Sequence, residues 1–512
     1  MMRRREFLGY VGRTAAAGGV ALAAGRRAWP IGEASPGTAR RASVTDFGAD
    51  STGQTDSTAA VQKAIASLAR RNARLVFPAG KYTFAASNAV LMDFNGYEGL
   101  EIFGNGAELS FAAATQPLRL TSCKDLEVHD IIVDWTRPPC SQTGERGIAD
   151  AGALRLNGCE QILLETVVFH AAPGAAISFS GCRDITLDTV RVMPHPGSGR
   201  AISSCGDGVA ILDCTGTVSA QHALISGTGG AGMRVQQSYW RVSQLADPQA
   251  AVLASADGKP VPEWLLPKPG TYMQISEAES LKLLGEIVVT KAEPLSGGMR
   301  LSFAETLSPA VGKGTLFCLS ATNQAQLKMD DCKLSGGPSV GLVAQSRARI
   351  ASSTFRGYGG PAILLAPDLE QMRGPVVENI HINDCTFAEC NLAPGDEPGA
   401  ITIDTAPHGT GAATPAARVN EGITLQRNVF SRLGGPAIYC AGATWLDVES
   451  NRFYDCDRRR AAGEQPRVIV LRNLDQSTIA SNEANGPGKI VMIDCTEKVK
   501  VGDNGALTSA TA

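Results

Sequence analysis

The sequence predicts an all-β protein, a right-handed parallel β-helix in which short strands stack coil upon coil along one axis. Composition is the first observation: of 512 residues, 44% are hydrophobic, only 5% are aromatic and 56 are glycine. This balance favours many short strands and tight turns over a helical bundle. The second observation is a short apolar pattern that returns about eleven times along the chain, as expected for a solenoid.

The repeated pattern has four inward positions, arranged as two alternating apolar pairs with two residues between them. Alternation of period two is typical of a strand, and the change of phase between the pairs indicates a bend. Each copy therefore predicts two short strands that meet at a corner, with the inward residues of successive copies stacked in ladders. Clear copies are Ile162, Leu164, Val167 and Phe169; Ile185, Leu187, Val190 and Val192; and Ile423, Leu425, Asn428 and Phe430.

In each of two columns of the repeat, one residue type recurs over four copies, and Cys332 and Cys385 share the column of the asparagines. An inward asparagine at the bend can bond its copies in the coils before and after it, and buried cysteines can pack as small apolar residues. The thirteen cysteines are odd in number and lack CxxC or zinc-like spacing, so we expect most to be reduced and buried. The columns are Asn428, Asn451, Asn482 and Asn504, and Cys123, Cys159, Cys182 and Cys214.

The chain divides into four predicted parts. Residues 1–40 hold an arginine run at 3–5, Phe7-Leu8 and a weakly apolar stretch at 14–25, which is typical of a twin-arginine export signal; a basic tail is the alternative. Residues 41–235 are the first part of the β-helix, 236–320 an inserted β-barrel-like domain, and 321–512 the second part of the β-helix. We therefore expect a periplasmic or extracellular protein without a membrane span.

A helix predicted at 56–72 covers the open N-terminal end of the solenoid. Val61, Ile65 and Leu68 fall on one face of it, and an uncovered end would expose core and unpaired strand edges. The formal net charge of −3 and a pI near 6.1 argue against nucleic acid as a partner. No His pair has metal spacing, so neither a metal nor a cofactor is expected.

The segments that flank this helix carry a resemblance. VTDFGAD at 44–50 precedes it and FPAGKY at 77–82 follows it. This arrangement resembles the N-terminal cap of the pectin-lyase-like β-helix superfamily. The resemblance implies the fold and leaves the reaction open.

A second resemblance extends over residues 120–391. The motifs are VDWTRP at 133–138, GDG at 206–208, GTG at 227–229 and GP at 374–375, in that order and around the insertion. They are similar to the α-1,3-galactosidases of glycoside hydrolase family 110, which pair a β-helix with an inserted barrel. The resemblance implies an exo-acting, inverting glycosidase acting on an oligo- or polysaccharide.

The acidic residues of that family are not all retained. Inversion needs two carboxyl groups, one to protonate the leaving oxygen and one to activate water. The resemblance places Asp207 on one acidic position, but the family's Asp pair falls on Gly230 and Ala231 and its following Asn on Arg234. Since glycine and alanine cannot move protons, the family's mechanism does not carry over intact.

Other residues are candidates by coil position. Asp213 and Asp330 could replace the missing acids, although both are also typical turn residues, as is Asp207 itself between two glycines. Arg200 matches an arginine of the family motif and could bond a sugar hydroxyl. Trp135 could stack on a sugar or anchor the coils, and His195 and His222 could border the same groove or be ordinary hydrogen-bonded residues. The candidate catalytic residues are thus Asp207, Asp213 and Asp330, and the candidate substrate-binding residues are Arg200, Trp135, His195 and His222.

Three functions remain open from the sequence. The first is a glycoside hydrolase with an altered site that acts on terminal galactosides or related sugars. The second is a carbohydrate-binding protein without catalysis. The third and least supported is a polysaccharide lyase, because the sequence has no persuasive acidic cluster for the Ca²⁺ site that lyases of this fold use.

Overall fold

The computed structural model describes residues 38–85, 90–112, 116–136, 152–255, 258–345, 347–393, 399–405 and 417–511. All of them belong to one compact unit, residues 36–512. The arginine run and apolar stretch of the predicted export signal lie outside these ranges. No helix among the described residues has the length and apolar character needed to cross a membrane.

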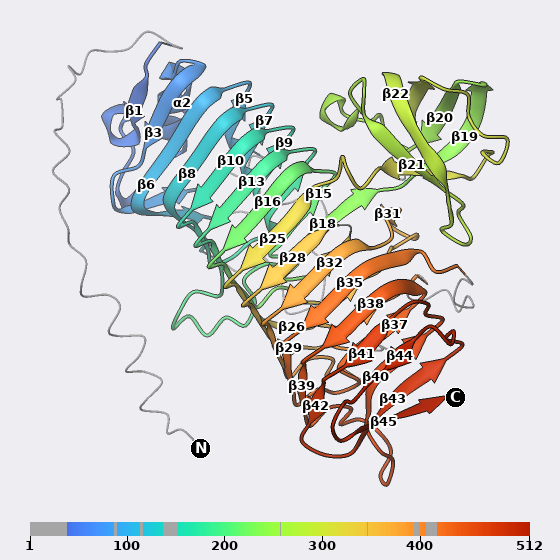
Figure 1. The fold of residues 1–512 in the computed structure, drawn as a ribbon. Helices are drawn as coiled ribbons and strands as arrows, with labels where there is room; N and C mark the ends of the chain where they lie inside the picture. Colours follow the sequence, from blue (N-terminus) through green and yellow to red (C-terminus); the bar gives the residue numbers. More distant parts are fainter. Residues whose placement is uncertain are drawn as a thin grey trace. The chain divides into compact units, whose positions relative to one another are not determined.

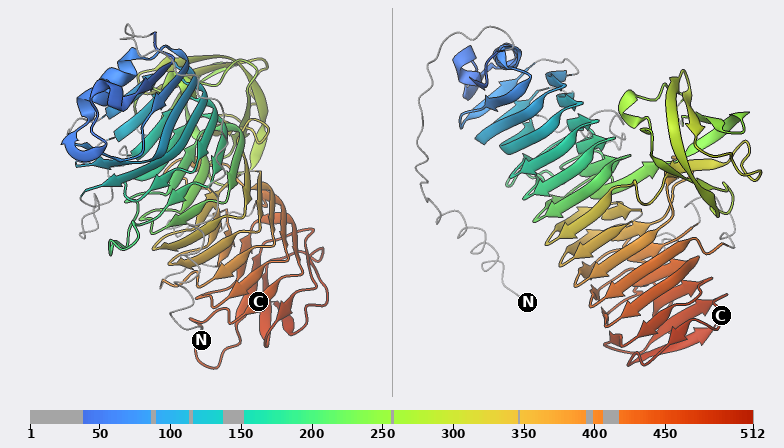
Figure 2. Two further views of the ribbon diagram at one scale, coloured as in Figure 1. Left: turned by 90° about the vertical axis from the view of Figure 1, so that its left-hand side faces the viewer. Right: turned by 45° about the horizontal axis from the view of Figure 1, so that its top comes forward.

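The described part of the chain forms a parallel β-helix, as predicted, with one inserted barrel (Figures 1 and 2). Each regular coil adds one strand to a sheet that we call sheet 2, then two short strands joined at a bend to sheet 1. A loop then leads back to sheet 2. In one such coil β15 lies in sheet 2 and β16 and β17 lie in sheet 1, and the loop at 227–232 leads to β18.

Sheet 1 has 25 strands within the described ranges, and all of its pairings are parallel. Its strands are β1 (Arg41–Ser43), β2 (Thr52–Asp56), β3 (Arg71–Val76), β4 (Lys81–Phe84), β6 (Glu98–Phe111), β8 (Lys124–Trp135), β10 (Glu160–Glu165), β11 (Val168–Phe169), β13 (Arg183–Asp188), β14 (Arg191–Val192), β16 (Thr215–Gln221), β17 (Leu224–Ser226), β25 (Gln326–Asp330), β26 (Lys333–Gly337), β28 (Ala348–Ala351), β29 (Thr354–Tyr358), β32 (Glu378–Asn383), β33 (Thr386–Ala388), β35 (Asn420–Gln426), β36 (Val429–Ser431), β38 (Ala443–Glu449), β39 (Arg452–Tyr454), β41 (Thr478–Ala480), β42 (Glu483–Ala484) and β44 (Lys500–Val501).

Sheet 2 has 14 strands within the same ranges, one of which, β31, pairs antiparallel with the end of β18. Its strands are β5 (Val90–Asn95), β7 (Gln116–Thr121), β9 (Gly152–Asn157), β12 (Ala175–Ser180), β15 (Val209–Leu212), β18 (Met233–Ser238), β27 (Leu342–Ala344), β30 (Ile363–Leu365), β31 (Arg373–Gly374), β34 (Ile401–Ile403), β37 (Ile438–Ala441), β40 (Arg467–Arg472), β43 (Gly488–Ile493) and β45 (Leu507–Thr511).

The N-terminal end of the solenoid carries the predicted capping helix. A short 3₁₀ helix, η1 (Val44–Phe47), precedes β2, and α2 (Thr58–Ser67) follows it. Asp56 accepts a hydrogen bond from the backbone N–H of Thr58 at 3.1 Å. Val61, Ile65 and Leu68 are buried against the first coils, so α2 covers the apolar end of the stack.

The inward ladder is confirmed. Ile185, Leu187, Val190 and Val192 are at most 1% exposed, and Leu187 pairs in register with Leu164 on one side and Ala220 on the other. A ladder of phenylalanines stacks through the second strands of four coils, with ring centroids 4.8 to 5.2 Å apart. These residues are Phe355, Phe387, Phe430 and Phe453.

The asparagine column is confirmed as a hydrogen-bonded ladder. Asn428 donates from its backbone N and from Nδ2 to Asn451 Oδ1, at 3.0 Å each. Asn451 makes the same two bonds to Asn482 at 3.0 Å, and Asn482 Nδ2 donates to Asn504 Oδ1 at 2.8 Å. Because the Nδ2 atoms also reach strand carbonyls, each buried amide satisfies the bend of its own coil and of its neighbour.

The cysteine prediction is confirmed for the part of the chain that the structure describes. Eleven described cysteines are free, and all of these but Cys495 are buried. Burial raises the pKa of the Cys332 thiol to about 11 and that of Cys385 to about 12. Cys205 is disulfide-bonded.

The insertion folds as a closed six-stranded barrel with its own apolar core. The predicted start at 236 falls inside β18, which still belongs to sheet 2. Trp264, on η2 (Glu263–Leu265), covers two glycine turns of the β-helix: a Cβ at Gly158 would lie 2.4 Å from Trp264 Cβ, and one at Gly181 2.7 Å from Trp264 O. The barrel strands are β19 (Trp240–Asp247), β20 (Ala250–Ala254), β21 (Tyr272–Ser276), β22 (Leu283–Leu295), β23 (Gly298–Phe303) and β24 (Leu316–Leu319).

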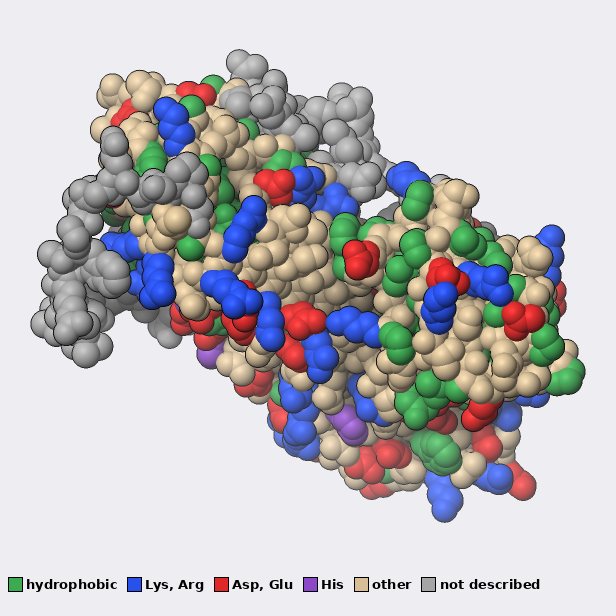
Figure 3. All heavy atoms as spheres, turned by 90° about the horizontal axis from the view of Figure 1, so that it is seen from above, with side chains coloured by type: hydrophobic (Ala, Val, Ile, Leu, Met, Phe, Trp, Pro, Cys, Tyr) green, Lys and Arg blue, Asp and Glu red, His purple; other side chains and the backbone are tan. Residues whose placement is uncertain are grey.

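Ion pairs between neighbouring coils line the outer surface, where Figure 3 shows basic and acidic side chains next to one another. Lys81 pairs with Glu108 at 2.7 Å and Arg432 with Glu389 at 2.9 Å. Exposed pairs of this kind contribute about 0–1 kcal/mol each, so the buried ladders dominate the stability of the stack.

Candidate functional site

Asp207 lies at the end of the loop at 193–208, directly before β15. Its Oδ2 accepts a hydrogen bond from Arg234 Nε at 2.7 Å, and its Oδ1 accepts one from the backbone N–H of Ala231, also at 2.7 Å. The side chain of Asp207 is 15% exposed and that of Arg234 24%. Both carboxylate oxygens are thus engaged by the next coil.

Gly230 leaves the space in which this carboxylate sits. A Cβ at Gly230 would lie 2.4 Å from Asp207 Oδ1 and 2.9 Å from Asp207 N. A side chain at this position therefore requires Asp207 to move. Gly230 thus makes room for Asp207, and the backbone N–H of Ala231 binds it.

Asp213 belongs to a different arrangement, at the end of β15. It accepts hydrogen bonds from the backbone N of Ser238 at 2.5 Å and from Ser238 Oγ at 2.9 Å, and Arg373 Nη1 donates to it at 3.2 Å. Ser238 and Arg373 pair across β18 and β31, where the chain leaves the β-helix for the barrel. Asp213 therefore anchors the root of the insertion.

The structure does not bring the three candidate acids together. Asp207 and Asp213 flank the extended strand β15 and are six residues apart, roughly 20 Å at a rise of about 3.3 Å per residue. An inverting pair needs a separation of roughly 6.5–9.5 Å. Asp330 is exposed at the end of β25 in sheet 1, beside the bend of its coil. The grouping of Asp213 and Asp330 with Asp207 is therefore wrong, because coil position along the sequence does not specify the side of the coil.

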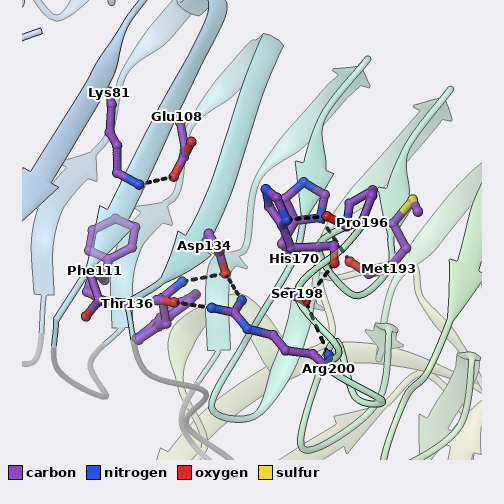
Figure 4. Close-up of polar contacts among 12 residues, drawn as sticks. Lys81, Glu108, Phe111, Asp134, Thr136, His170, Met193, Pro196, Ser198 and Arg200 are labelled. Atoms are coloured by element: carbon purple, nitrogen blue, oxygen red, sulfur yellow. Dashed lines mark hydrogen bonds and ion pairs between the residues drawn. The ribbon is translucent and has the colours of Figure 1, made fainter. Parts of the chain in front are cut away.

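Arg200 reaches from the loop at 193–208 back across two coils (Figure 4). Its Nη1 donates to Asp134 Oδ1 and its Nη2 to the backbone O of Trp135 at 2.9 Å. The side chains of Arg200 and Asp134 are 17% and 10% exposed. This largely buried, charge-assisted pair fixes the loop on the end of β8.

Trp135 does not present its ring to a sugar. It is 1% exposed and packs on Phe111 with ring centroids 5.2 Å apart. Of the two alternatives for Trp135, the structure has the anchor between coils, and the expectation of sugar stacking is wrong.

The two predicted histidines lie on different sides of the coil. His195 is exposed in the loop at 193–208, and its ring packs edge-on against His170 with centroids 4.8 Å apart. His222 lies at the bend between β16 and β17 and contacts Asp188 at 3.2 Å. A shared border for His195 and His222 is therefore wrong, and His195 alone lies in the loop that holds Arg200 and Asp207.

The rings of His170 and His195 have defined tautomers. Nδ1 of His170 contacts Met193 O at 3.0 Å and Nδ1 of His195 contacts Pro196 O at 2.9 Å, as Figure 4 shows for His170. A carbonyl oxygen only accepts, so Nδ1 carries the proton in both rings. Of the two rings, only that of His195 is exposed, so its Nε2 is the nitrogen that a ligand hydroxyl can reach.

Sequence reasoning did not assign His170, Asp134 and Arg373 to the site. His170 directly follows the inward Phe169 of its coil. This position could have indicated a site residue, because it lies where the coil turns back toward sheet 2. Arg373 could not be found by coil counting, because it lies 160 residues from Asp213 across the insertion. Among the residues with described positions, no group of three His, Cys, Asp or Glu side chains could hold a metal ion.

Comparison with known proteins gives two family matches. The family model for rhamnogalacturonase A/epimerase, pectate lyase-like proteins matches residues 42–252, and the right-handed β-helix region model matches residues 317–504. Alpha-1,3-galactosidase B from Bacteroides thetaiotaomicron is 30% identical over 118 residues. That match covers 20% of this chain and only 19% of the galactosidase.

Solved β-helix structures align along most of the chain. The surface adhesin PfbA of Streptococcus pneumoniae has 13% identity and a TM-score of 0.42, over 92% of this chain and 98% of that one. The family 28 exopolygalacturonase of Yersinia enterocolitica has 11% identity and a TM-score of 0.42, over 93% and 78%. Similarity at this level carries no argument about the site. From the fold and the family matches, the chain is a right-handed β-helix protein of the pectin-lyase-like superfamily, with a sequence relationship to the α-1,3-galactosidases of glycoside hydrolase family 110.

Proposed function

We propose that the chain is an exported, glycoside hydrolase-like protein with an altered catalytic site. It binds a terminal galactoside or a related sugar of an oligo- or polysaccharide on the surface formed by the loop at 193–208. Its α-1,3-galactosidase activity is absent or very weak. The sequence relationship to an α-1,3-galactosidase supports the sugar class, and the arginine run and apolar stretch at 3–25 support export by the twin-arginine route.

The ion pair of Asp207 with Arg234 is the observation that carries this proposal. Hydrolysis with inversion requires one group that gives a proton to the leaving oxygen and another that takes one from water. Both oxygens of Asp207 already accept hydrogen bonds from Arg234 and Ala231, and Gly230 supplies no second carboxyl group. General acid or base help is worth about 10² to 10⁴ in rate per group, so the family's reaction loses most of its acceleration here.

Binding depends on other groups and survives these changes. Nε2 of the exposed His195 can accept from a sugar hydroxyl, and Arg200 fixes the loop that presents His195. Hydroxyl recognition of this kind needs no proton transfer. The site is therefore a recognition surface on a hydrolase scaffold.

Calorimetric titration of an α-1,3-linked galactose disaccharide into the purified protein tests the proposal. We expect measurable binding by the parent and about 5- to 30-fold weaker binding by His195→Ala, since loss of one to two hydrogen bonds costs about 1–2 kcal/mol. His222→Ala, a matched exposed histidine at the bend of the next coil, leaves the affinity unchanged. Absence of binding to this disaccharide and to a panel of plant, algal and mucin glycans contradicts the proposal.

A further inference from the structure

A column of turns at the start of the sheet 1 strands requires the left-handed backbone conformation. Six coils place Gly, Asp, Gln or Asn there, and apart from Gln161 these are residues that adopt positive φ at low cost. Trp445 holds the equivalent position before β38's inward Leu446, with φ of 56°. Positive φ is common at the turns of these coils, but a side chain as bulky as tryptophan is disfavoured there. The six coils have Gly99, Asp125, Gln161, Asp184, Asn379 and Gly422.

The indole of Trp445 is held in place and open to solvent. It is 52% exposed, the most exposed of the large hydrophobic side chains in the described ranges. Its Nε1 donates to Gln476 Oε1 of the next coil at 3.2 Å. In the preceding coil the same register position is Gly422, because Glu421 pairs with Thr444 and Ile423 with Leu446. No side chain from that position covers the ring.

Trp445 forms one wall of an open hollow of about 600 Å³. This volume is in the range of small-molecule sites. Thr478 and Lys500 are register partners on β41 and β44, so their side chains lie next to each other in successive coils. Gln476, Glu497 and Lys498 also line the hollow.

The charged groups of the hollow favour an anionic ligand. Neither Lys498 nor Lys500 makes an ion pair within 4.0 Å with a carboxylate of the described residues, and Glu497 is the single acid of the lining. The nearby Asp475 is engaged internally: a hydrogen bond from Thr496 lowers its pKa, and the backbone N–H of Gln476 donates to it at 3.0 Å. Lys498 also acts on Asp475, but only at longer range.

We propose that this hollow is a second glycan-binding site, in which a pyranose ring of an acidic glycan stacks on Trp445 and its carboxylate or sulfate binds Lys498 and Lys500. The assignment rests on the proposed function in taking a glycan as the ligand. Five strand pairings along sheet 1 separate β38 from β16, the coil of Asp207, roughly 24 Å at about 4.8 Å per coil. The two sites are separate, and they also lie on different sides of their coils, because Asp207 precedes a sheet 2 strand and Trp445 lies at the start of a sheet 1 strand.

Retardation of the full-length protein in native gels that contain polygalacturonate, a sulfated galactan or a neutral galactan tests this site. We expect Trp445→Asn to bind the acidic glycans about tenfold more weakly, as loss of ring stacking implies, and to bind the neutral galactan like the parent. Asn379 already occupies this turn position, so Trp445→Asn unfolds at the parent's temperature or above it. Lys498→Gln/Lys500→Gln also lowers retardation, and the polygalacturonate and sulfated galactan lanes distinguish carboxylate from sulfate.

Two variants separate the outcomes. Tyr454→Asn removes another exposed aromatic ring and leaves retardation unchanged, while His195→Ala affects only binding at the first site. Equal retardation of Trp445→Asn and the parent in both acidic gels overturns the second site, whatever happens to His195→Ala. Equal loss in the neutral gel overturns the acidic ligand. If neither the parent nor any variant binds the α-1,3-linked disaccharide, but Trp445→Asn still weakens retardation in the acidic gels, the proposed function is rejected. The hollow then remains a polyanion site.

Discussion

The pairing of Asp207 with Arg234 combines three residues of the next coil into one local structure. Arg234 supplies a charged donor, Gly230 makes room for the carboxylate, and Ala231 supplies a backbone donor. A partly buried carboxylate that loses its partner keeps its desolvation cost. The contributions of Gly230, Ala231 and Arg234 to this structure therefore depend on each other.

This dependence predicts the result of a double-mutant cycle. Arg234→Met alone should lower the free energy of unfolding by about 1–3 kcal/mol, because Asp207 remains partly buried without its charged donor. Asp207→Asn/Arg234→Met should cost less than the sum of the single changes. Urea unfolding of the four proteins measures this, and additive single effects would contradict the coupling.

An acid introduced at position 230 should not create galactosidase activity. Gly230→Asp places a Cβ within 2.4 Å of Asp207 Oδ1, so we expect a loss of stability of about 1–3 kcal/mol and no gain of galactosidase activity. Gly230→Ala, which adds only the Cβ, should cost a similar amount. Thermal unfolding and galactose release check both variants, and hydrolysis by stable Gly230→Asp would show that the site is poised for catalysis.

At the scale of elements, the bend of each coil depends on buried polar side chains. Asn451 bonds to Asn428 and Asn482 and is fully buried, so Asn451→Ala leaves the backbone N–H of Asn428 and one of its two Nδ2 hydrogens without an acceptor. We expect a loss of about 2–5 kcal/mol in the free energy of unfolding. Asn485→Ala, at an exposed site, is the control, and its expected effect is near zero. Equal stability of the two variants would reject the ladder as a stabilising element.

The buried thiols predict alkaline instability of the coils. A thiol in the unfolded chain ionises near its ordinary pKa of 9.0, but Cys332 and Cys385 ionise near pH 11 and 12 in the fold because burial disfavours the thiolate. The contribution of these two thiols to the free energy of unfolding is fully present below about pH 9 and is lost as the pH rises from about 9 to 12. Melting temperatures at pH 7, 9 and 10.5 measure the fall, which should be smaller in Cys332→Ala/Cys385→Ala. A flat profile across this range would contradict the assignment.

For the whole molecule, the repeat made most of the fold predictable. The positions of ladder residues such as Leu187 and Asn428 recur in each copy of the repeat. Because the coils stack, residues at the same position in successive copies contact one another. The site was less predictable. Arg373 contacts Asp213 only because the chain returns to the β-helix after the barrel. Asp330 lies on a different side of its coil from Asp207, because it ends a strand of sheet 1 and Asp207 precedes a strand of sheet 2. Trp445 could not be predicted as a site residue, because its side chain points outward and the repeat was identified from inward apolar residues.

We propose that this β-helix recognises sugar without α-1,3-galactosidase catalysis. Galactose release from an α-1,3-linked galactose disaccharide, followed with the parent, Asp207→Ala and an active family 110 enzyme at equal concentration, tests it most directly. We expect the parent to turn over at least about 10² to 10⁴ times more slowly than the active enzyme, and Asp207→Ala to be no slower than the parent. Turnover by the parent within about tenfold of the active enzyme, abolished in Asp207→Ala, would contradict the claim and make Asp207 a catalytic acid or base.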